Sequence, residues 1–173
     1  MVENETVTML KITLDTCEII NTDQSVLLIR LKELISQGKI DVAVTTRVIA
    51  DKDQDQNLAR KKTHLNALDE YPTIGTNFRL DFSRLDSGDF LIGEDLDLIG
   101  KKIEHVIFTE IHLDDKHSHN KWADVDHLIG HYQSGRDVFV TEDLDILKKH
   151  RNLHELGIEV ENLQTFVKRI NNE

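Results

Sequence analysis

The chain has 173 residues, of which 39% are hydrophobic and 31% are charged, so it is long enough to form a folded domain with a substantial core. Its formal net charge of −11 argues against a protein that binds nucleic acid through a basic surface, because phosphate contacts depend on Lys and Arg. A nuclease is still compatible with this charge, since a divalent cation held by acids attracts phosphate groups.

Two features of the chain bear on where the protein works. Cys17 is the only cysteine, so the chain cannot form an internal disulfide, and this fits a reducing compartment. The first residues, MVENETVTMLK, lack the basic segment and apolar run of a secretory signal, and no apolar run approaches the roughly 20 residues that span a bilayer. We therefore predict a cytoplasmic protein that does not enter the membrane.

The amino-terminal part of the chain predicts two strands joined by a helix. An apolar strand is expected at 11–15, ending in Asp15, and a second strand is expected at 41–46. Between them, apolar residues recur at helical spacing, and Gly38 marks the end of this helix. Such a strand–helix–strand unit implies a parallel sheet.

The middle of the chain is more polar. Residues 47–67 carry acids early and bases late, an order that suits the dipole of a helix. Residues 69–103 are the least regular part and include the only proline, Pro72, and we interpret them as an insertion or flap within a single domain. Alternating apolar residues at 78–85 favour a short half-buried strand, and residues 96–102 favour a short helix.

Strands and helices alternate again in the carboxyl-terminal part. A third strand is predicted at 104–109, a polar loop at 113–121, and then a helix, a tight turn and a strand within 122–140. A helix at about 144–151, a strand at 157–160 and a final amphipathic helix complete the pattern. This order predicts one domain over the whole chain with an α/β fold, a three-layer α/β/α sandwich around a mostly parallel central sheet.

Acids follow two of the predicted strands and lie on one predicted helix. Asp15 and Asp143 come at the carboxyl ends of strands, and such ends meet at one edge of a parallel sheet, where α/β folds place ligands. Asp124 and Asp126 lie on opposite flanks of the helix, so both reach one site only from its first turn. Carboxylate oxygens suit hard cations. We therefore predict a Mg²⁺ or Mn²⁺ site whose ligands are Asp15, Asp124, Asp126 and Asp143.

The order of these acids resembles the PIN domain family, whose members have an RNase-H-like nuclease fold. In that family an Asp opens a helix, often with His three residues later, and a Gly and an apolar strand ending in Thr-x-Asp follow. The residues that match this order are Asp124, His127, Gly135, Phe139, Val140, Thr141 and Asp143. The first strand of the family also ends in an acid, as Asp15 does here. Asp51 is the best match to a second acid, for which the family more commonly has Glu.

The resemblance implies a metal-dependent ribonuclease that hydrolyses RNA phosphodiester bonds, with Mg²⁺ or Mn²⁺ activating a bound water. Its catalytic acids would be Asp15, Asp51, Asp124 and Asp143. The candidates for binding the substrate are Arg47, Lys52 and Thr141. Because many members of the family are toxin ribonucleases, a toxin-type endoribonuclease is one expectation. The partners implied are RNA, an antitoxin protein and a second copy of the chain in a homodimer.

Three other interpretations use the same residues differently. A haloacid-dehalogenase-type phosphatase would use Asp15 as its nucleophile, but that family has a second Asp two residues later, where this chain has Cys17. A non-catalytic PIN-like module would bind RNA or a protein partner with an incomplete set of acids. His127 and His131 are spaced on a helix so that they could share a zinc ion, but no cluster of cysteines accompanies them.

Overall fold

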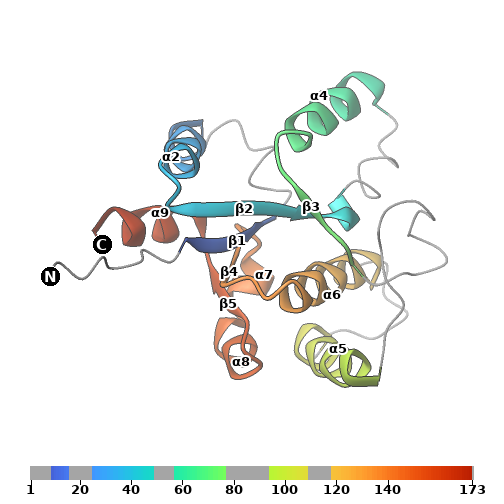
Figure 1. The fold of residues 1–173 in the computed structure, drawn as a ribbon. Coiled ribbons are helices and arrows are strands. Elements are labelled where there is room, and N and C mark those ends of the chain that lie inside the picture. Colours follow the sequence, from blue (N-terminus) through green and yellow to red (C-terminus); the bar gives the residue numbers. More distant parts are fainter. Residues whose placement is uncertain (1–8, 16–24, 49–56, 77–93, 109–117, 173) are drawn as a thin grey trace, which may run out of the picture.

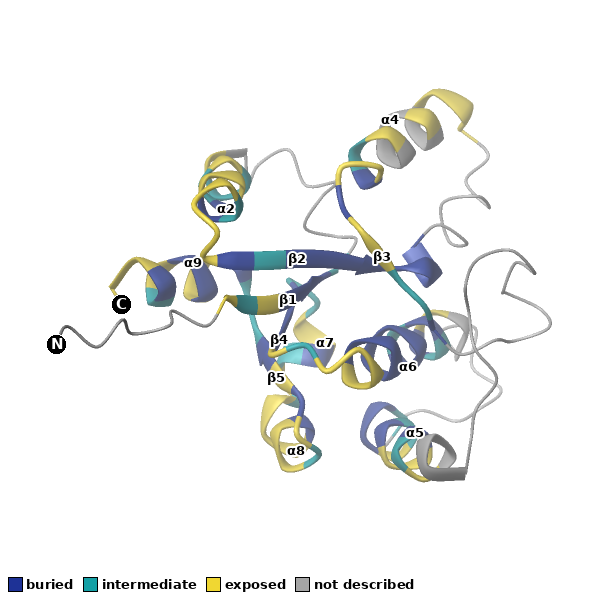
Figure 2. Cartoon of the chain, viewed as in Figure 1, coloured by how far each residue is buried: buried dark blue, intermediate teal, exposed yellow. Residues whose placement is uncertain are grey.

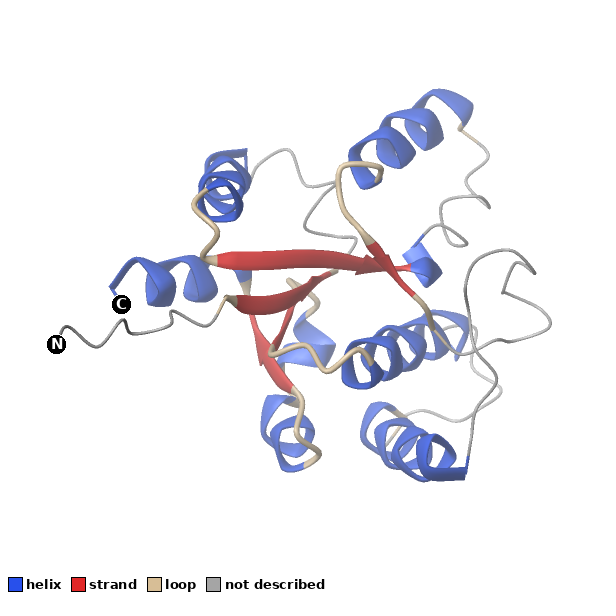
Figure 3. Cartoon of the chain, viewed as in Figure 1, coloured by secondary structure: helices blue, strands red, loops and turns tan. Residues whose placement is uncertain are grey.

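The computed structural model describes residues 9–15, 25–48, 57–76, 94–108 and 118–172. Within them, five parallel strands form one sheet in the order β3-β2-β1-β4-β5 (Figure 1). The strands are β1 (Leu10–Leu14), β2 (Ile40–Thr45), β3 (Thr73–Ile74), β4 (Val138–Val140) and β5 (Glu159–Glu161). Helices lie on both sides of this sheet (Figure 3), so the predicted three-layer α/β/α sandwich is confirmed.

One face of the sheet is covered by α2 (Ser25–Ser36) and α9 (Leu163–Asn172). Leu34 of α2 and Phe166 of α9 are fully buried and belong to one apolar cluster with residues of β1, β2 and β4. The apolar stripes predicted for both helices therefore face the sheet, and their outer sides are exposed (Figure 2).

The other face is covered by α5 (Glu94–Ile107), α6 (Ser118–Gln133) and α8 (His150–Glu155). Phe139 of β4 belongs to the cluster on this face, whereas its neighbours Val138 and Val140 belong to the first cluster. This is the alternation that a strand buried on both sides requires. Most of the described residues of α6 are buried (Figure 2), so this helix is the best-anchored element on this face.

A glycine and two histidines hold α6 against the sheet. A Cβ atom at Gly130 would come within 2.8 Å of the carbonyl oxygen of the residue after β3, so only glycine allows this close approach. His131 Nδ1 and Thr13 Oγ1 form a hydrogen bond of 2.8 Å, and His127 Nδ1 pairs with Thr45 Oγ1. Burial lowers the pKa of His131 to about 4, so its ring is neutral near pH 7. These contacts position α6 and the acids that it carries.

One predicted strand and one predicted boundary are wrong. The strand predicted at 104–109 is not formed by its described residues, of which 104–107 form the last turn of α5. A short apolar run has no decisive period of its own, and here Ile99, Ile103 and Ile107 continue one helical face that packs in the cluster with α6. Residues 118–121, predicted as loop, belong to α6, which begins about one turn earlier than expected.

Several other predictions concern the middle and the end of the chain. The charged segment contains a helix, α4 (Leu58–Leu68), and the range 69–103 contains β3 and most of α5. The strand predicted at 78–85 lies outside the described residues. The helix predicted at 144–151 is divided between α7 (Leu144–Leu147) and α8. No helix in the described ranges is long and apolar enough to cross a membrane.

Candidate functional site

The strand order reverses between β1 and β4. The chain adds β2 and β3 on one side of β1, and β4 and β5 on the other side. Connections therefore leave β1 and β4 in opposite directions, and α/β folds bind ligands at such a point of reversal. Asp15 directly follows β1, and Thr141 directly follows β4. The two predicted residues are thus brought to the same point from positions 126 residues apart.

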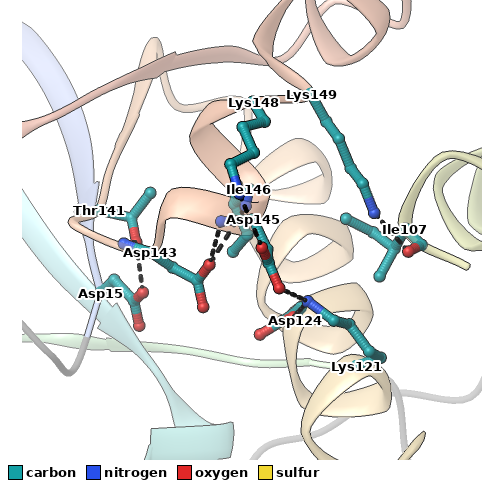
Figure 4. Close-up of polar contacts among 10 residues, drawn as sticks. All are labelled: Asp15, Ile107, Lys121, Asp124, Thr141, Asp143, Asp145, Ile146, Lys148 and Lys149. Atoms are coloured by element: carbon teal, nitrogen blue, oxygen red, sulfur yellow. Dashed lines mark hydrogen bonds and ion pairs between the residues drawn. The ribbon is translucent and has the colours of Figure 1, made fainter. Parts of the chain in front are cut away.

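Thr141 links two of the predicted acids. Its buried hydroxyl donates a hydrogen bond of 2.6 Å to Asp15 Oδ2, and it accepts one of 2.9 Å from the backbone N–H of Asp143 (Figure 4). The Asp15 backbone N–H also donates to the Val140 carbonyl at 2.9 Å, which continues the pairing of β1 with β4. Thr141 therefore fixes Asp15 relative to Asp143, and in this structure its hydroxyl is a positioning group for the acids.

Asp143 caps the short helix α7. Its Oδ1 accepts hydrogen bonds of 2.7 Å from the Asp145 N–H and 3.2 Å from the Ile146 N–H. An aspartate at this position satisfies backbone donors that the first turn of a helix leaves open. The cap holds one carboxylate oxygen toward α7, so the orientation of the side chain is set by the helix itself.

Asp124 approaches the same region from α6. Its side chain is only 15% exposed. The pKa of its carboxyl is raised to about 6, mainly by burial and also by the negative charges of Asp143 and Asp15, while Lys121 and His127 act in the opposite direction. Figure 4 shows the three acids entering this region from the end of β1, from α6 and from the start of α7. Asp124 is therefore close enough to feel the charge of both other acids.

A lysine that sequence reasoning missed completes the group. Lys121 Nζ lies 3.4 Å from Asp124 Oδ2 and 3.0 Å from Asp145 Oδ2, and its side chain is only 9% exposed (Figure 4). Lys121 falls in the segment predicted as loop. Had the helix been extended by one turn, the i,i+3 spacing of Lys121 and Asp124 would have indicated this pair.

Arg47 and Asp126 are placed against each other and not among these acids. Arg47 Nη1 lies 3.7 Å from Asp126 Oδ2, and both side chains are almost completely buried. Asp126 is two residues beyond Asp124, which rotates it by about 200° around the helix. Asp124 lies nearly two turns into α6 instead of in the first turn, so the condition for both aspartates to reach one site is not met. The structure therefore does not place Asp126 where the sequence argument required it for a shared site with Asp124, and the role of Arg47 as a substrate contact stays a prediction.

The remaining predicted residues lie outside the described ranges. Asp51 and Lys52 fall within 49–56, and Cys17 falls within 16–24.

The two histidines weighed as zinc ligands are in the described part of α6. His127 and His131 each direct Nδ1 to a threonine of the sheet. These contacts give both histidines a role in seating α6 without a metal.

The carboxylates fit a cation with incomplete protein coordination. Among the residues that the structure describes, no three His, Cys, Asp or Glu side chains are gathered closely enough to enclose a metal ion by themselves. Mg²⁺ does not require such a cage, because it keeps several waters and is usually bound by one or two carboxylates together with substrate phosphates. An all-oxygen donor set at the carboxyl ends of β1 and β4, with one acid whose pKa is raised mainly by burial, is therefore compatible with Mg²⁺ or Mn²⁺.

Comparisons with known proteins add no assignment. Neither a scan against models of protein families nor a search of curated proteins finds a match to this chain.

Proposed function

We propose that this protein is a metal-dependent ribonuclease that hydrolyses RNA phosphodiester bonds, with Mg²⁺ or Mn²⁺ held by Asp15, Asp124 and Asp143. The observation that carries the proposal is the convergence of these acids, from three separate elements, on the point where the strand order reverses. A bound cation would relieve the repulsion that Asp143 and Asp15 exert on Asp124. The resemblance of the motif to PIN domains supports the same chemistry.

Within this proposal the residues have unequal roles. A bound ion would lower the pKa of a water ligand and stabilise charge on the scissile phosphate. Asp15, Asp124 and Asp143 bind and orient the ion, and Thr141 holds two of them in a fixed relation before the substrate arrives. Asp51 stays a predicted fourth acid. Arg47 and Asp126 are left out of this ligand set, because both side chains are almost completely buried and lie 3.7 Å from each other.

The test is RNA cleavage by the purified protein. A mixture of structured and single-stranded RNA is incubated with Mn²⁺ or with a chelator, and products are resolved by gel. We expect cleavage with Mn²⁺ alone, and a loss of more than about 100-fold in Asp15→Asn and Asp143→Asn, because each removes a charged ligand. Asp137→Asn is the matched control, since it changes an exposed aspartate at the opposite end of the same sheet.

A second candidate is a non-catalytic PIN-like module that binds RNA or a protein. It would apply if the second acid of the site is missing, and Asp51, the best match to that acid, lies outside the described residues. It predicts RNA retention in a gel-shift assay without cleavage under any metal condition. The toxin-type role, an antitoxin partner, a homodimer and the cytoplasmic location stay predictions, and each needs its own experiment.

A further inference from the structure

Lys121 connects the two helices that carry acids of the candidate site. It lies one turn before Asp124 on α6, and its ammonium also reaches Asp145 in the first turn of α7. Asp145 is the residue whose N–H binds the Asp143 carboxylate. One ammonium group therefore lies between Asp124 and the helix start that Asp143 caps.

Lys121 brings a positive charge into contact with two carboxylates. Its ammonium lies 3.0 Å from Asp145 Oδ2, and a lysine is protonated at neutral pH. A buried ammonium with two carboxylates in contact is held more firmly than a surface lysine, since its charge is poorly screened by water. It also meets the Asp124 carboxylate at a distance of 3.4 Å.

This position matters for the number of metal ions. Two-metal hydrolytic sites hold their ions about 3.5–4 Å apart, bridged by shared carboxylates, so every acid in the site serves one ion or both. Here one oxygen of Asp124 already faces an ammonium of the chain. A second divalent ion beside Asp124 would have to approach this fixed positive charge, and the repulsion would be strong in a partly dry site.

We propose that Lys121 takes the place of a second divalent cation, so that the site binds one ion only. The inference rests on the proposed function, because it assumes that Asp15, Asp124 and Asp143 bind a metal. Lys121 acts through the positive charge that it places 3.4 Å from Asp124 Oδ2.

The test is the stoichiometry of Mn²⁺ binding by the full chain, measured by isothermal titration calorimetry and by the electron paramagnetic resonance signal of free Mn²⁺. Wild type is expected to bind one ion. Lys121→Met and Lys121→Gln should bind two ions, or bind the first at least about tenfold more tightly, because an opposing charge is lost. Lys121→Gln keeps a hydrogen-bond donor for the two aspartates, so it separates loss of charge from loss of fold. Lys121→Arg should restore single occupancy.

Lys148→Met is the matched control. Lys148 lies 3.6 Å from the other oxygen of Asp145, but its side chain is 73% exposed, so the same charge is removed at the surface. Its Mn²⁺ binding should equal that of wild type. Two ions in the wild type, or one ion with unchanged or weaker affinity in both neutral Lys121 variants, would overturn the role of Lys121 alone. A wild type that binds no Mn²⁺ would overturn the proposed function and this inference with it.

Discussion

Opposite charges are paired at the amino ends of the strands, whereas at the carboxyl ends several acids gather and Lys121 offsets only part of their charge. Arg136, just before β4, donates hydrogen bonds of 2.8 Å to the Ile12 carbonyl and 2.6 Å to the Asp41 carbonyl, and it lies 3.0 Å from the Asp41 carboxylate. Asp137 accepts a hydrogen bond of 2.7 Å from the Lys11 N–H. These contacts join the beginnings of β1, β2 and β4, and they stabilise the sheet.

At the carboxyl ends the same strands bring acids together. The pKa of Asp124 rises to about 6 because of burial and because of the charges of Asp143 and Asp15. An ionised acid in that setting destabilises the folded protein near neutral pH. Groups whose pKa is shifted against stability gather at functional sites more often than elsewhere. The contrast between the two ends is therefore an independent reason to place the function at the carboxyl end.

The largest expected effect is at the amino end. Arg136→Met removes a guanidinium that is 8% exposed, and it leaves two carbonyl oxygens and the Asp41 carboxylate without this donor. We expect a loss of about 3 kcal/mol in the free energy of unfolding, because two backbone carbonyl oxygens lose a charged donor, while the Asp41 carboxylate is 32% exposed and remains partly hydrated. Urea unfolding followed by circular dichroism measures it.

The control for this prediction is a lysine in a surface pair. Lys32 lies 2.6 Å from Glu70, but both side chains are more than half exposed. Lys32→Met should therefore change stability by less than about 1 kcal/mol. Equal effects of the two substitutions would contradict the view that the amino end of the sheet is a stabilising clamp.

The carboxyl end should respond with the opposite sign. Asp124→Asn should increase the free energy of unfolding near pH 8, because it removes an acid whose pKa is raised from 3.8 to about 6 on folding. The gain should be about 2 kcal/mol, since the full shift is worth roughly 3 kcal/mol and Lys121 loses a partner. Asp145→Asn is the control: its pKa is lowered by the hydrogen bond to Lys121, so its removal should destabilise slightly.

The gain in Asp124→Asn should disappear in acid. The raised pKa of Asp124 makes wild type more stable as the pH falls from about 6 toward 3.8. The pKa of His131, lowered from 6.5 to about 4, makes the protein less stable as the pH falls through that window. Wild type has both effects, whereas the variant has only the destabilising effect of His131, which is about 3 kcal/mol. The stability of the variant should therefore fall to that of wild type or below near pH 4.5. If the variant is less stable than wild type at every pH, the ionised Asp124 carboxylate does not destabilise the folded protein.

The sequence allowed the framework and two of the acids to be predicted, because their signals are local. Apolar runs identified β1, β2 and β4, and an acid after a strand has a fixed place in a parallel sheet, so Asp15 and Asp143 were brought to one edge as expected. The fold class followed from the alternation of strands and helices.

What the sequence could not supply were contacts that depend on where helices begin. Residues 104–107 favour strand locally, but the face of α5 continues through them. Asp126 was taken as a ligand because α6 was expected to start near Trp122, which would put Asp126 close to the first turn. The helix starts earlier, so Asp126 lies well beyond the first turn, where it contacts Arg47. Lys121 was assigned to a loop for the same reason. An error of one turn in the start of α6 therefore placed Asp126 in the site and left Lys121 out of it.

The smallest expected effect tests how tightly α6 is held above the carboxyl end. Gly130→Ala places a Cβ atom 2.8 Å from a backbone oxygen, which cannot move as a flexible side chain does. We expect a loss of about 1–2 kcal/mol despite the higher helix propensity of alanine, because α6 must shift from the sheet. Differential scanning fluorimetry and urea unfolding measure this loss.

Gly100→Ala is its matched partner. The new Cβ would lie 3.3 Å from Ile129 Cδ1, the end of a flexible side chain, so adaptation should cost little and alanine should leave stability unchanged or slightly higher. If α6 positions Asp124, Gly130→Ala should also weaken Mn²⁺ binding while Gly100→Ala does not. Loss of stability without any change in Mn²⁺ binding would show that the site tolerates a displaced α6, and that Asp15 and Asp143 hold the ion without help from Asp124.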